Sequence, residues 1–138
     1  MPLLARKSVL AIAAVTEIAV HGSKRPVTAK ALASRYGLPA RHLETVLQAL
    51  ERHGILKGIR GPRGGYELAR ERSRISADQI LQAAANADDE VISSGGSQLL
   101  DEVVKPAISQ AEHAFSAALA RISVEDLTQS AQGLRKAS

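Results

Sequence analysis

The chain has 138 residues, the size of one ordinary domain, and 45% of them are hydrophobic while only 2% are aromatic. It contains no cysteine, which excludes disulfides, thiolate metal ligands and thiol redox switching. The charge is unevenly spread, because residues 1–75 carry 14 Lys and Arg against 5 Asp and Glu, whereas residues 76–138 carry 4 against 9. A basic half of this kind indicates that residues 1–75 meet a polyanion.

Residues 3–21 predict a first helix that is apolar on nearly every side and therefore buried. Arg6 and Lys7 before the apolar run imitate a signal peptide, but Thr16 and Glu17 interrupt the run and no clear cleavage site follows. No stretch approaches the roughly 20 apolar residues of a membrane span. We therefore expect a cytoplasmic protein without a leader or a membrane anchor. The side chains expected to be buried are Val9, Ile12, Ala13, Val15, Ile18, Ala19 and Val20.

A short helix is predicted next, with Thr28 as its N-cap and with Ala31 and Leu32 as its apolar contacts. Gly37 then supplies a turn that leads the chain into a longer helix. A short helix, a glycine turn and a second helix in this order are typical of a helix-turn-helix.

The second helix of the pair is predicted to run from Pro39, which suits a first turn, to Gly54, which suits the left-handed position beyond a helix end. Its apolar residues fall at i, i+3, i+4 and i+7 and form one stripe, while polar residues share another face. The apolar stripe consists of Leu43, Val46, Leu47 and Leu50, and the polar face of Arg41, Thr45, Gln48 and Arg52.

Two short strands are predicted at residues 55–59 and 66–69, joined by a loop rich in glycine. Arg60 and Arg63 lie in this loop. A polar-faced helix followed at once by a hairpin with a basic tip is typical of a winged helix-turn-helix. In that fold the helix lies in a DNA major groove, while the hairpin tip reaches the backbone or the next minor groove.

Three stretches resemble the Rrf2-type bacterial transcription regulators: RYGLPARHLE at residues 35–44, LERHGIL at residues 50–56 and RGPRGGYELA at residues 60–69. That family includes iron–sulfur and nitric-oxide sensing repressors. The resemblance extends from about Leu4 to Leu127 and is strongest in the hairpin.

The resemblance implies a homodimer that binds a partly palindromic operator. By position, Arg41 and Glu44 match recognition-helix residues that read bases, and Arg60 matches the hairpin arginine that enters the minor groove. Solvation of Glu44, or its pairing with Arg41, is an equally open alternative. Family sensors hold their cluster with three cysteines, and this chain has none, so we expect no cofactor.

Residues 76–85 predict a helix that begins with a capping box of Ser76 and Gln79, with Ile75 and Ile80 as its hydrophobic staple. Residues 86–97 are irregular and acidic, and in relatives this neighbourhood carries the cluster cysteines. We expect that any effector of this chain is instead an unidentified small molecule that binds here. Val91, Ile92, Leu99 and Leu100 beside Asp88, Asp89 and Glu90 could form such a pocket.

Residues 98–121 predict a long helix, which Pro106 should kink or start late. Apolar residues along it alternate by four and three, a heptad pattern that favours dimerisation because residues 1–75 are expected to have a core of their own. Residues 123–127 predict a short terminal turn, and residues 128–138 a disordered tail. The expected dimerisation residues are Val104, Ile108, Ala111, Phe115, Ala118 and Ile122.

Motifs for metal binding or catalysis are not found in the sequence. No glycine-rich loop precedes a helix as a phosphate-binding loop would, and no catalytic triad or carboxylate pair can be defended. We therefore expect neither a metal site nor an enzyme. No i, i+4 pair and no cysteine partner occurs among His21, His42, His53 and His113.

These patterns predict a mainly α protein with a small β-hairpin: a winged helix-turn-helix head at residues 1–75, a helical dimerisation and sensor region at 76–127, and a disordered tail at 128–138. We expect a homodimeric transcription regulator, a repressor by resemblance, that binds double-stranded operator DNA. The alternatives are an adaptor whose basic face meets an acidic protein and, more weakly, an RNA-binding winged helix; two arginines on a glycine-rich tip favour DNA. The residues expected to contact DNA are Thr28, Lys30, Arg41, Glu44, Thr45, Gln48, Arg60 and Arg63.

Overall fold

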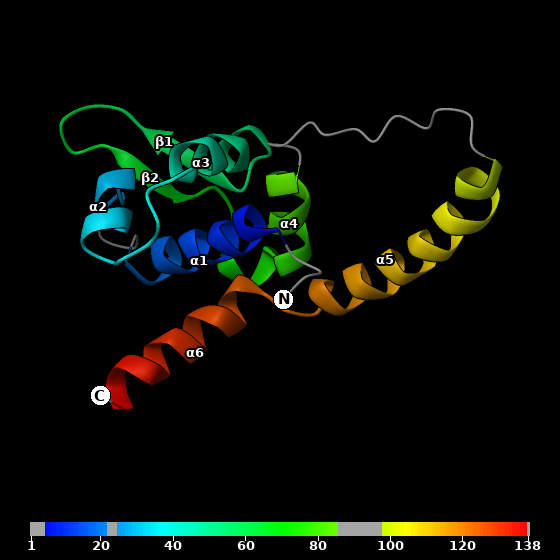
Figure 1. The fold of residues 1–138 in the computed structure, drawn as a ribbon. Helices are drawn as coiled ribbons and strands as arrows, with labels where there is room; N and C mark the ends of the chain where they lie inside the picture. The colour runs from blue at the N-terminus through cyan, green and yellow to red at the C-terminus, as the bar shows by residue number, and fades with distance from the viewer. Residues whose placement is uncertain (1–4, 22–24, 86–97, 138) are drawn as a thin grey trace.

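The computed structural model describes residues 5–21, 25–85 and 98–137, and it confirms a mainly helical fold with one two-stranded antiparallel hairpin (Figure 1). Among these residues no helix is both long and apolar enough to cross a membrane. The helices and strands are α1 (Arg6–His21), α2 (Ala29–Ser34), α3 (Leu43–Arg52), β1 (Leu56–Ile59), β2 (Gly65–Leu68), α4 (Ala77–Ala85), α5 (Lys105–Ala120) and α6 (Val124–Ala137), with a 3-10 turn η1 (Arg72–Arg74) and a π-helical turn η2 (Leu100–Val104).

Helix α1 is the centre of the core and packs against α3, α4 and α6. Small side chains at Ala11 and Ala14 let neighbouring helices approach closely, while Val15 and Ile18 fill the space between them. The expectation that α1 is buried on nearly every side is wrong at Val9, which is 51% exposed. The elements that pack on α1, which are α3, α4, α6 and β2, therefore leave the side chain of Val9 uncovered.

The helix-turn-helix begins as the sequence predicts. The Oγ1 atom of Thr28 accepts a hydrogen bond from the backbone N–H of Ala31 at 3.0 Å, which caps α2. Gly37 adopts the left-handed conformation with φ +74°, and the chain turns there toward α3.

Helix α3 begins later than expected, at Leu43 instead of Pro39. His42 adopts the left-handed conformation with φ 65°, which an α-helix cannot contain, so the chain forms a separate turn before the helix starts. Arg41 consequently lies in this turn and not on the helix. The other end is as predicted: Gly54 is left-handed, and the N–H of Ile55 donates to the Leu50 carbonyl at 3.0 Å in a Schellman motif.

The hairpin of β1 and β2 with its connecting loop, residues 56–68, is called the wing below. Its register pairs Leu56 with Leu68 and Ile59 with Gly65. Two backbone hydrogen bonds of 2.9 and 2.7 Å join Tyr66 to Val27, the residue that leads into α2. The wing is therefore attached to the start of the helix-turn-helix through backbone groups.

Helix α4 begins with the predicted capping box. The Ser76 N–H donates to the Gln79 side chain at 3.1 Å, and the Gln79 N–H donates to Ser76 Oγ at 3.2 Å. Ile75 and Ile80 are fully buried in the same core as α1 and α3. The core thus continues past residue 75 into the segment that the sequence assigned to a separate region.

The expected disordered tail at residues 128–138 is contradicted, because α6 continues to Ala137. A second capping box starts this helix, with the Asp126 N–H donating to Ser123 Oγ at 3.0 Å and the Asp126 carboxylate accepting the Ser123 N–H at 3.1 Å. Thr128 is completely buried and its hydroxyl donates to the Val124 carbonyl. Packing against α1 stabilises α6 as a helix, although its polar, alanine-rich sequence does not predict a stable helix by itself.

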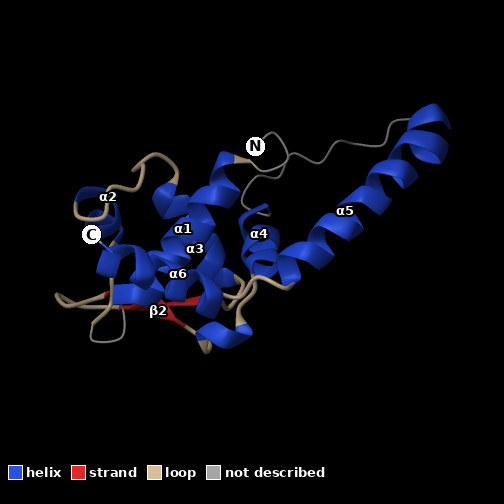
Figure 2. Ribbon diagram, turned by 90° about the horizontal axis from the view of Figure 1, so that it is seen from below, coloured by secondary structure: helices blue, strands red, loops and turns tan. Residues whose placement is uncertain are grey.

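The long helix is divided by Pro106, as expected. Residues 100–104 form the π-helical turn η2, and α5 starts at Lys105 with Pro106 in its first turn, where the missing N–H costs no helical hydrogen bond. Helix α5 extends away from the core and approaches it only at its C-terminal end, beside α4 (Figure 1 and Figure 2).

Candidate nucleic-acid interface

The two faces of α3 differ as the sequence predicts. Its apolar stripe is buried, with Leu47 and Leu50 inaccessible to solvent. Glu44, Thr45 and Gln48 are all exposed on the opposite side, within the first six residues of the helix. Arg41 is exposed in the turn just before it. The four residues expected to face bases are thus solvent-accessible in one short segment.

One residue of the wing is hydrogen-bonded to α3 and a second is affected by the charges of α3, and the sequence predicted neither relationship. The Glu51 carboxylate at the end of α3 accepts the backbone N–H of Gly58 in β1 at 2.9 Å. Tyr66 of β2 is half-buried, and its pKa is raised by burial first and then by the carboxylates of Glu51 and Glu44. Glu44 forms no ion pair within the described part of the chain. No sequence spacing signals a contact between a helix and a strand of this kind.

The tip of the wing depends on glycine. The N–H of Gly64 donates to the Gly61 carbonyl at 2.9 Å, and a Cβ on Gly64 would overlap the carbonyl oxygens of Ile59 and Gly61. Gly65 has φ +148° and lies against the backbone of Val27, which leaves no room for a side chain. Arg60 at the end of β1 is exposed on this tight tip.

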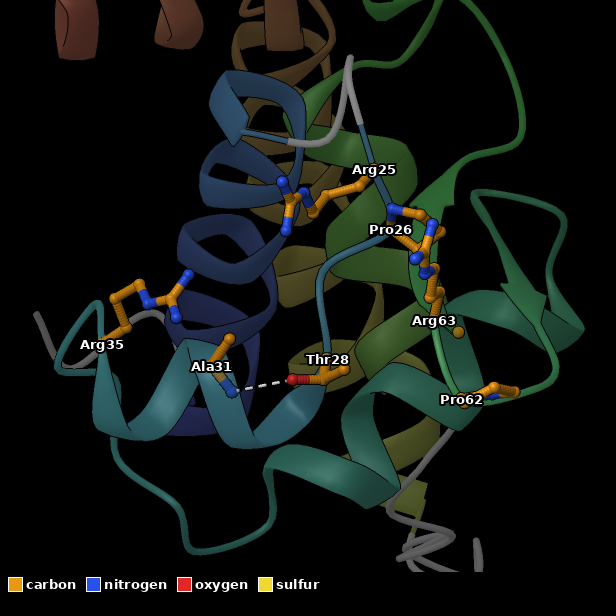
Figure 3. Close-up of a pocket in the computed structure, with 8 residues that line it drawn as sticks. Arg25, Pro26, Thr28, Ala31, Arg35, Pro62 and Arg63 are labelled. Carbon is orange, nitrogen blue, oxygen red and sulfur yellow. Dashed lines mark hydrogen bonds between the residues drawn. The ribbon is translucent and has the colours of Figure 1, made fainter.

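A hollow of about 740 Å³ lies between α2 and the tip of the wing (Figure 3). Three arginines from three separate segments line it: Arg25 before α2, Arg35 after α2, and Arg63 in the wing. The sequence predicted a DNA contact for Arg63 but not for Arg25 or Arg35, because the spacing of the three arginines does not indicate that they lie close together. The remaining lining residues are Pro26, Thr28, Ala31, Pro62 and Gly64.

The expected contacts on α2 are also accessible. Lys30 and Thr28 are both exposed. Thr28 Oγ1 accepts the Ala31 N–H, so its hydroxyl proton is still available to donate to a phosphate oxygen. Helix α2 and the tip of the wing lie at the end of the molecule opposite α5 (Figure 1).

Four of the expected dimerisation residues lie on α5, while Val104 lies just before it and Ile122 just after it, and most of the six are uncovered in a single chain. Ile108 is 52% exposed, and Val104 and Ile122 are 38% and 39% exposed. Ala111 and Ala118 are exposed, and Phe115 is half-buried. Apolar side chains this accessible along a helix and its two ends are typical of an interface rather than of a protein core.

Comparison with known proteins identifies the family. The profile of Rrf2, described as an iron-dependent transcriptional regulator, matches residues 4–130. The chain belongs to the Rrf2 family. It is accordingly a DNA-binding transcription regulator with a winged helix-turn-helix, as the resemblance implies.

Two relatives of this Rrf2 regulator illustrate the range of similarity. A candidate HTH-type transcriptional regulator of Synechocystis sp., slr0846, is 35% identical over 126 residues, which cover 90% of this chain and 86% of that protein. The HTH-type transcriptional regulator IscR of Xenorhabdus nematophila is 30% identical over 86 residues, or 62% of this chain and 52% of IscR. The chain therefore matches about half the length of that IscR.

Solved structures show the same fold. IscR of T. potens superimposes with a TM-score of 0.71 at 26% identity, covering 93% of this chain and 87% of that one. CymR of B. subtilis, the global cysteine regulator, superimposes with a TM-score of 0.67 at 24% identity, covering 91% and 95%. The second likeness concerns the fold alone.

Because the family is described as iron-dependent, we compared the residues of this chain with those that an iron–sulfur cluster needs. Iron–sulfur clusters are held by cysteine thiolates, and this Rrf2 regulator has no cysteine. Among the described residues no three His, Asp or Glu side chains are arranged to hold a metal ion. The donor set does not fit a thiolate-ligated cluster. The expected effector segment at residues 86–97, with Asp88, Asp89, Glu90, Val91 and Ile92, lies outside the described residues.

Proposed function

We propose that this Rrf2 regulator is a homodimeric repressor that reads its operator without an iron–sulfur cluster. The observation that carries the proposal is the arrangement of α3 and the wing. An exposed polar helix face, at Glu44, Thr45 and Gln48, is joined by the Glu51–Gly58 hydrogen bond to a tight tip that carries Arg60. A helix and an arginine held together in this way suit adjacent major and minor grooves.

Base reading is assigned to the first six residues of α3 and the turn before it. Arg41 has the fork geometry that recognises guanine, and Gln48 can pair with adenine. Glu44 can accept a hydrogen bond from a cytosine amine, while Thr45 can contact a thymine methyl group. Lys30 and Thr28 supply phosphate contacts that position the helix without reading sequence.

Dimerisation is assigned to α5. The uncovered apolar residues follow a heptad pattern, so a second copy of the helix can cover them. In such a dimer the two copies of α3 would lie about 34–36 Å apart, one helical turn of DNA. The operator should then be a partly palindromic site with two half-sites.

The proposal is tested by selection from a random duplex library. We expect the protein to enrich one two-part sequence and to bind it at least about 10³-fold more tightly than random duplex at the same salt concentration. The Gln48→Ala variant should relax preference at a single position in each half-site, whereas Arg60→Ala should relax preference at flanking A·T-rich positions. Binding without any sequence preference, or binding only to an acidic protein, would overturn the proposal.

A further inference from the structure

We propose that the hollow between α2 and the wing is a phosphate-binding site that grips the backbone of operator DNA through Arg25, Arg35 and Arg63 (Figure 3). This inference rests on the proposed function. The site would bind the sugar-phosphate backbone of the DNA. The two arginines of the wing would then have different roles, because Arg60 enters the minor groove while Arg63 binds the backbone.

The charge of the hollow is not neutralised by the protein. No acidic residue lines it, and none of its three arginines forms an ion pair within the described residues. By contrast, Lys57 pairs with Glu67 at 3.0 Å and Arg72 pairs with Glu125 at 2.6 Å, so an acidic partner does neutralise these two cations. Bringing several like charges together without a counter-charge is unfavourable, so the hollow is suited to an anion.

The chemistry of the lining is suited to phosphate in particular. Guanidinium groups bind phosphate oxygens in a bidentate manner, and Arg25, Arg35 and Arg63 offer three of them. The hydroxyl of Thr28 lies on the same wall with its proton free to donate. Pro26, Ala31 and Pro62 supply apolar surface without competing charge.

The position of the hollow indicates that the phosphate belongs to a nucleic-acid strand. Arg25, Arg35 and Arg63 are exposed, so the hollow opens to the outside and a continuous chain can pass across it. Its walls are α2 and the wing. If α3 enters the major groove, a DNA strand must run past these two elements. Figure 3 shows Arg63 turned toward Pro26, into the hollow, where it can hold the strand whose minor groove receives Arg60.

The test compares the double variant Arg25→Ala with Arg35→Ala against a matched double variant, Arg70→Ala with Arg74→Ala. Both variants lose two exposed arginines, but Arg70 and Arg74 do not line the hollow. Affinity for the selected operator and for random duplex is measured at several salt concentrations, and thermal unfolding of each variant checks the fold.

The slope of log affinity against log salt concentration measures the number of phosphate contacts, and each lost contact reduces its magnitude by about 0.9. We expect the Arg25→Ala, Arg35→Ala variant, called the hollow variant, to have a slope smaller in magnitude by about 1.8 per bound protomer. Raising the salt fourfold should then cost the wild type about 12 times more affinity per protomer than the variant. Operator and random duplex should weaken by the same factor, because backbone contacts carry no sequence information. The matched variant should keep the wild-type slope.

A second arm uses inorganic phosphate as the probe, by calorimetry without DNA. Stoichiometric phosphate binding that the hollow variant loses, together with an unchanged DNA salt slope, would overturn the assignment to the DNA backbone and make the site one for a free anion. An unchanged slope with no phosphate binding would also overturn it. Both results are distinct from failure of the proposed function, in which the wild type itself shows no preferred operator.

Discussion

The Oε2 atom of Glu51, at the end of α3, accepts a hydrogen bond of 2.9 Å from the backbone N–H of Gly58 in β1. A Cβ on Gly58 would overlap that carboxylate, so the two residues fit each other closely. The contact joins the helix proposed to read the major groove to the wing proposed to enter the minor groove. This hydrogen bond, between residues seven apart in the sequence, therefore helps to fix the position of the wing relative to α3.

Substitution of Glu51 should separate its charge from its hydrogen bond. Glu51→Gln and Glu51→Ala both remove a negative charge, but the glutamine side chain still has an oxygen that can accept the Gly58 N–H. We expect Glu51→Ala to bind the operator several-fold more weakly than Glu51→Gln and to unfold with about 0.5–1 kcal/mol less stability. Operator titrations and chemical denaturation measure the two effects. Equal operator affinities for the two variants would show that the bond does not position the wing.

Substitution of Gly58 should act through the same contact. The added methyl group of Gly58→Ala must displace the Glu51 carboxylate, which lies where the Cβ would be. We expect Gly58→Ala to weaken operator binding in the wild type and to have little further effect in the Glu51→Ala background. A double-mutant cycle measures this coupling. Fully additive effects would contradict it.

Tyr66 provides a pH-dependent test of the same region. Burial first, and then Glu51 and Glu44, raise its pKa above the ordinary value of 10.0. The folded protein therefore keeps the phenol protonated where the unfolded chain would ionise it. The stability that this contributes is fully present below pH 10.0 and is lost as the pH rises through the folded-state pKa.

The Glu51→Gln substitution should lower the Tyr66 pKa without returning it to the ordinary value, because burial remains the larger cause. Absorbance titration of the tyrosinate measures this pKa. A Tyr36→Phe background leaves Tyr66 as the sole tyrosine of the chain. If the Tyr66 pKa is the same in the Glu51→Gln variant as in the protein that keeps Glu51, the charge of Glu51 does not affect Tyr66.

Charge placed in the apolar stripe of α5 should abolish the dimer. Ile108→Glu with Phe115→Glu puts like charges where two copies of the helix are proposed to meet. We expect monomers by sedimentation, with operator affinity reduced by about 10²-fold or more because the two heads no longer bind together. Gln110→Glu with Ala117→Glu, exposed positions outside the stripe, is the matched control and should stay dimeric. A dimeric Ile108→Glu, Phe115→Glu protein would locate the interface elsewhere.

The absence of cysteine leads to a spectroscopic prediction. Protein purified without oxygen should be colourless and contain no stoichiometric iron, since His and carboxylate groups are poor substitutes for thiolates in a cluster. Its DNA binding should not respond to nitric oxide through a cluster. Iron analysis and a visible absorption spectrum check this expectation, and stoichiometric iron with a charge-transfer band would contradict it.

Several elements could be predicted because their determinants lie within a few residues of one another. The Thr28 cap, the Ser76 capping box and the glycine that ends α3 at Gly54 each depend on hydrogen bonds spanning three to five residues. The apolar stripe of α3 follows from helical periodicity alone. The strands of the wing were predicted to within one residue of their observed ends, and the family motifs in them led to the family.

Other features were decided only by tertiary structure, because periodicity and capping patterns in the sequence do not report them. The left-handed His42 delays α3 and leaves Arg41 in a turn, and Thr128 becomes buried only because α6 meets α1. The Glu51–Gly58 bond and the convergence of Arg25, Arg35 and Arg63 have no local signature either. Periodicity and capping report on neighbours along the chain, whereas the side chains proposed to hold DNA are brought together by packing of α1, α2, α3 and the wing around one core.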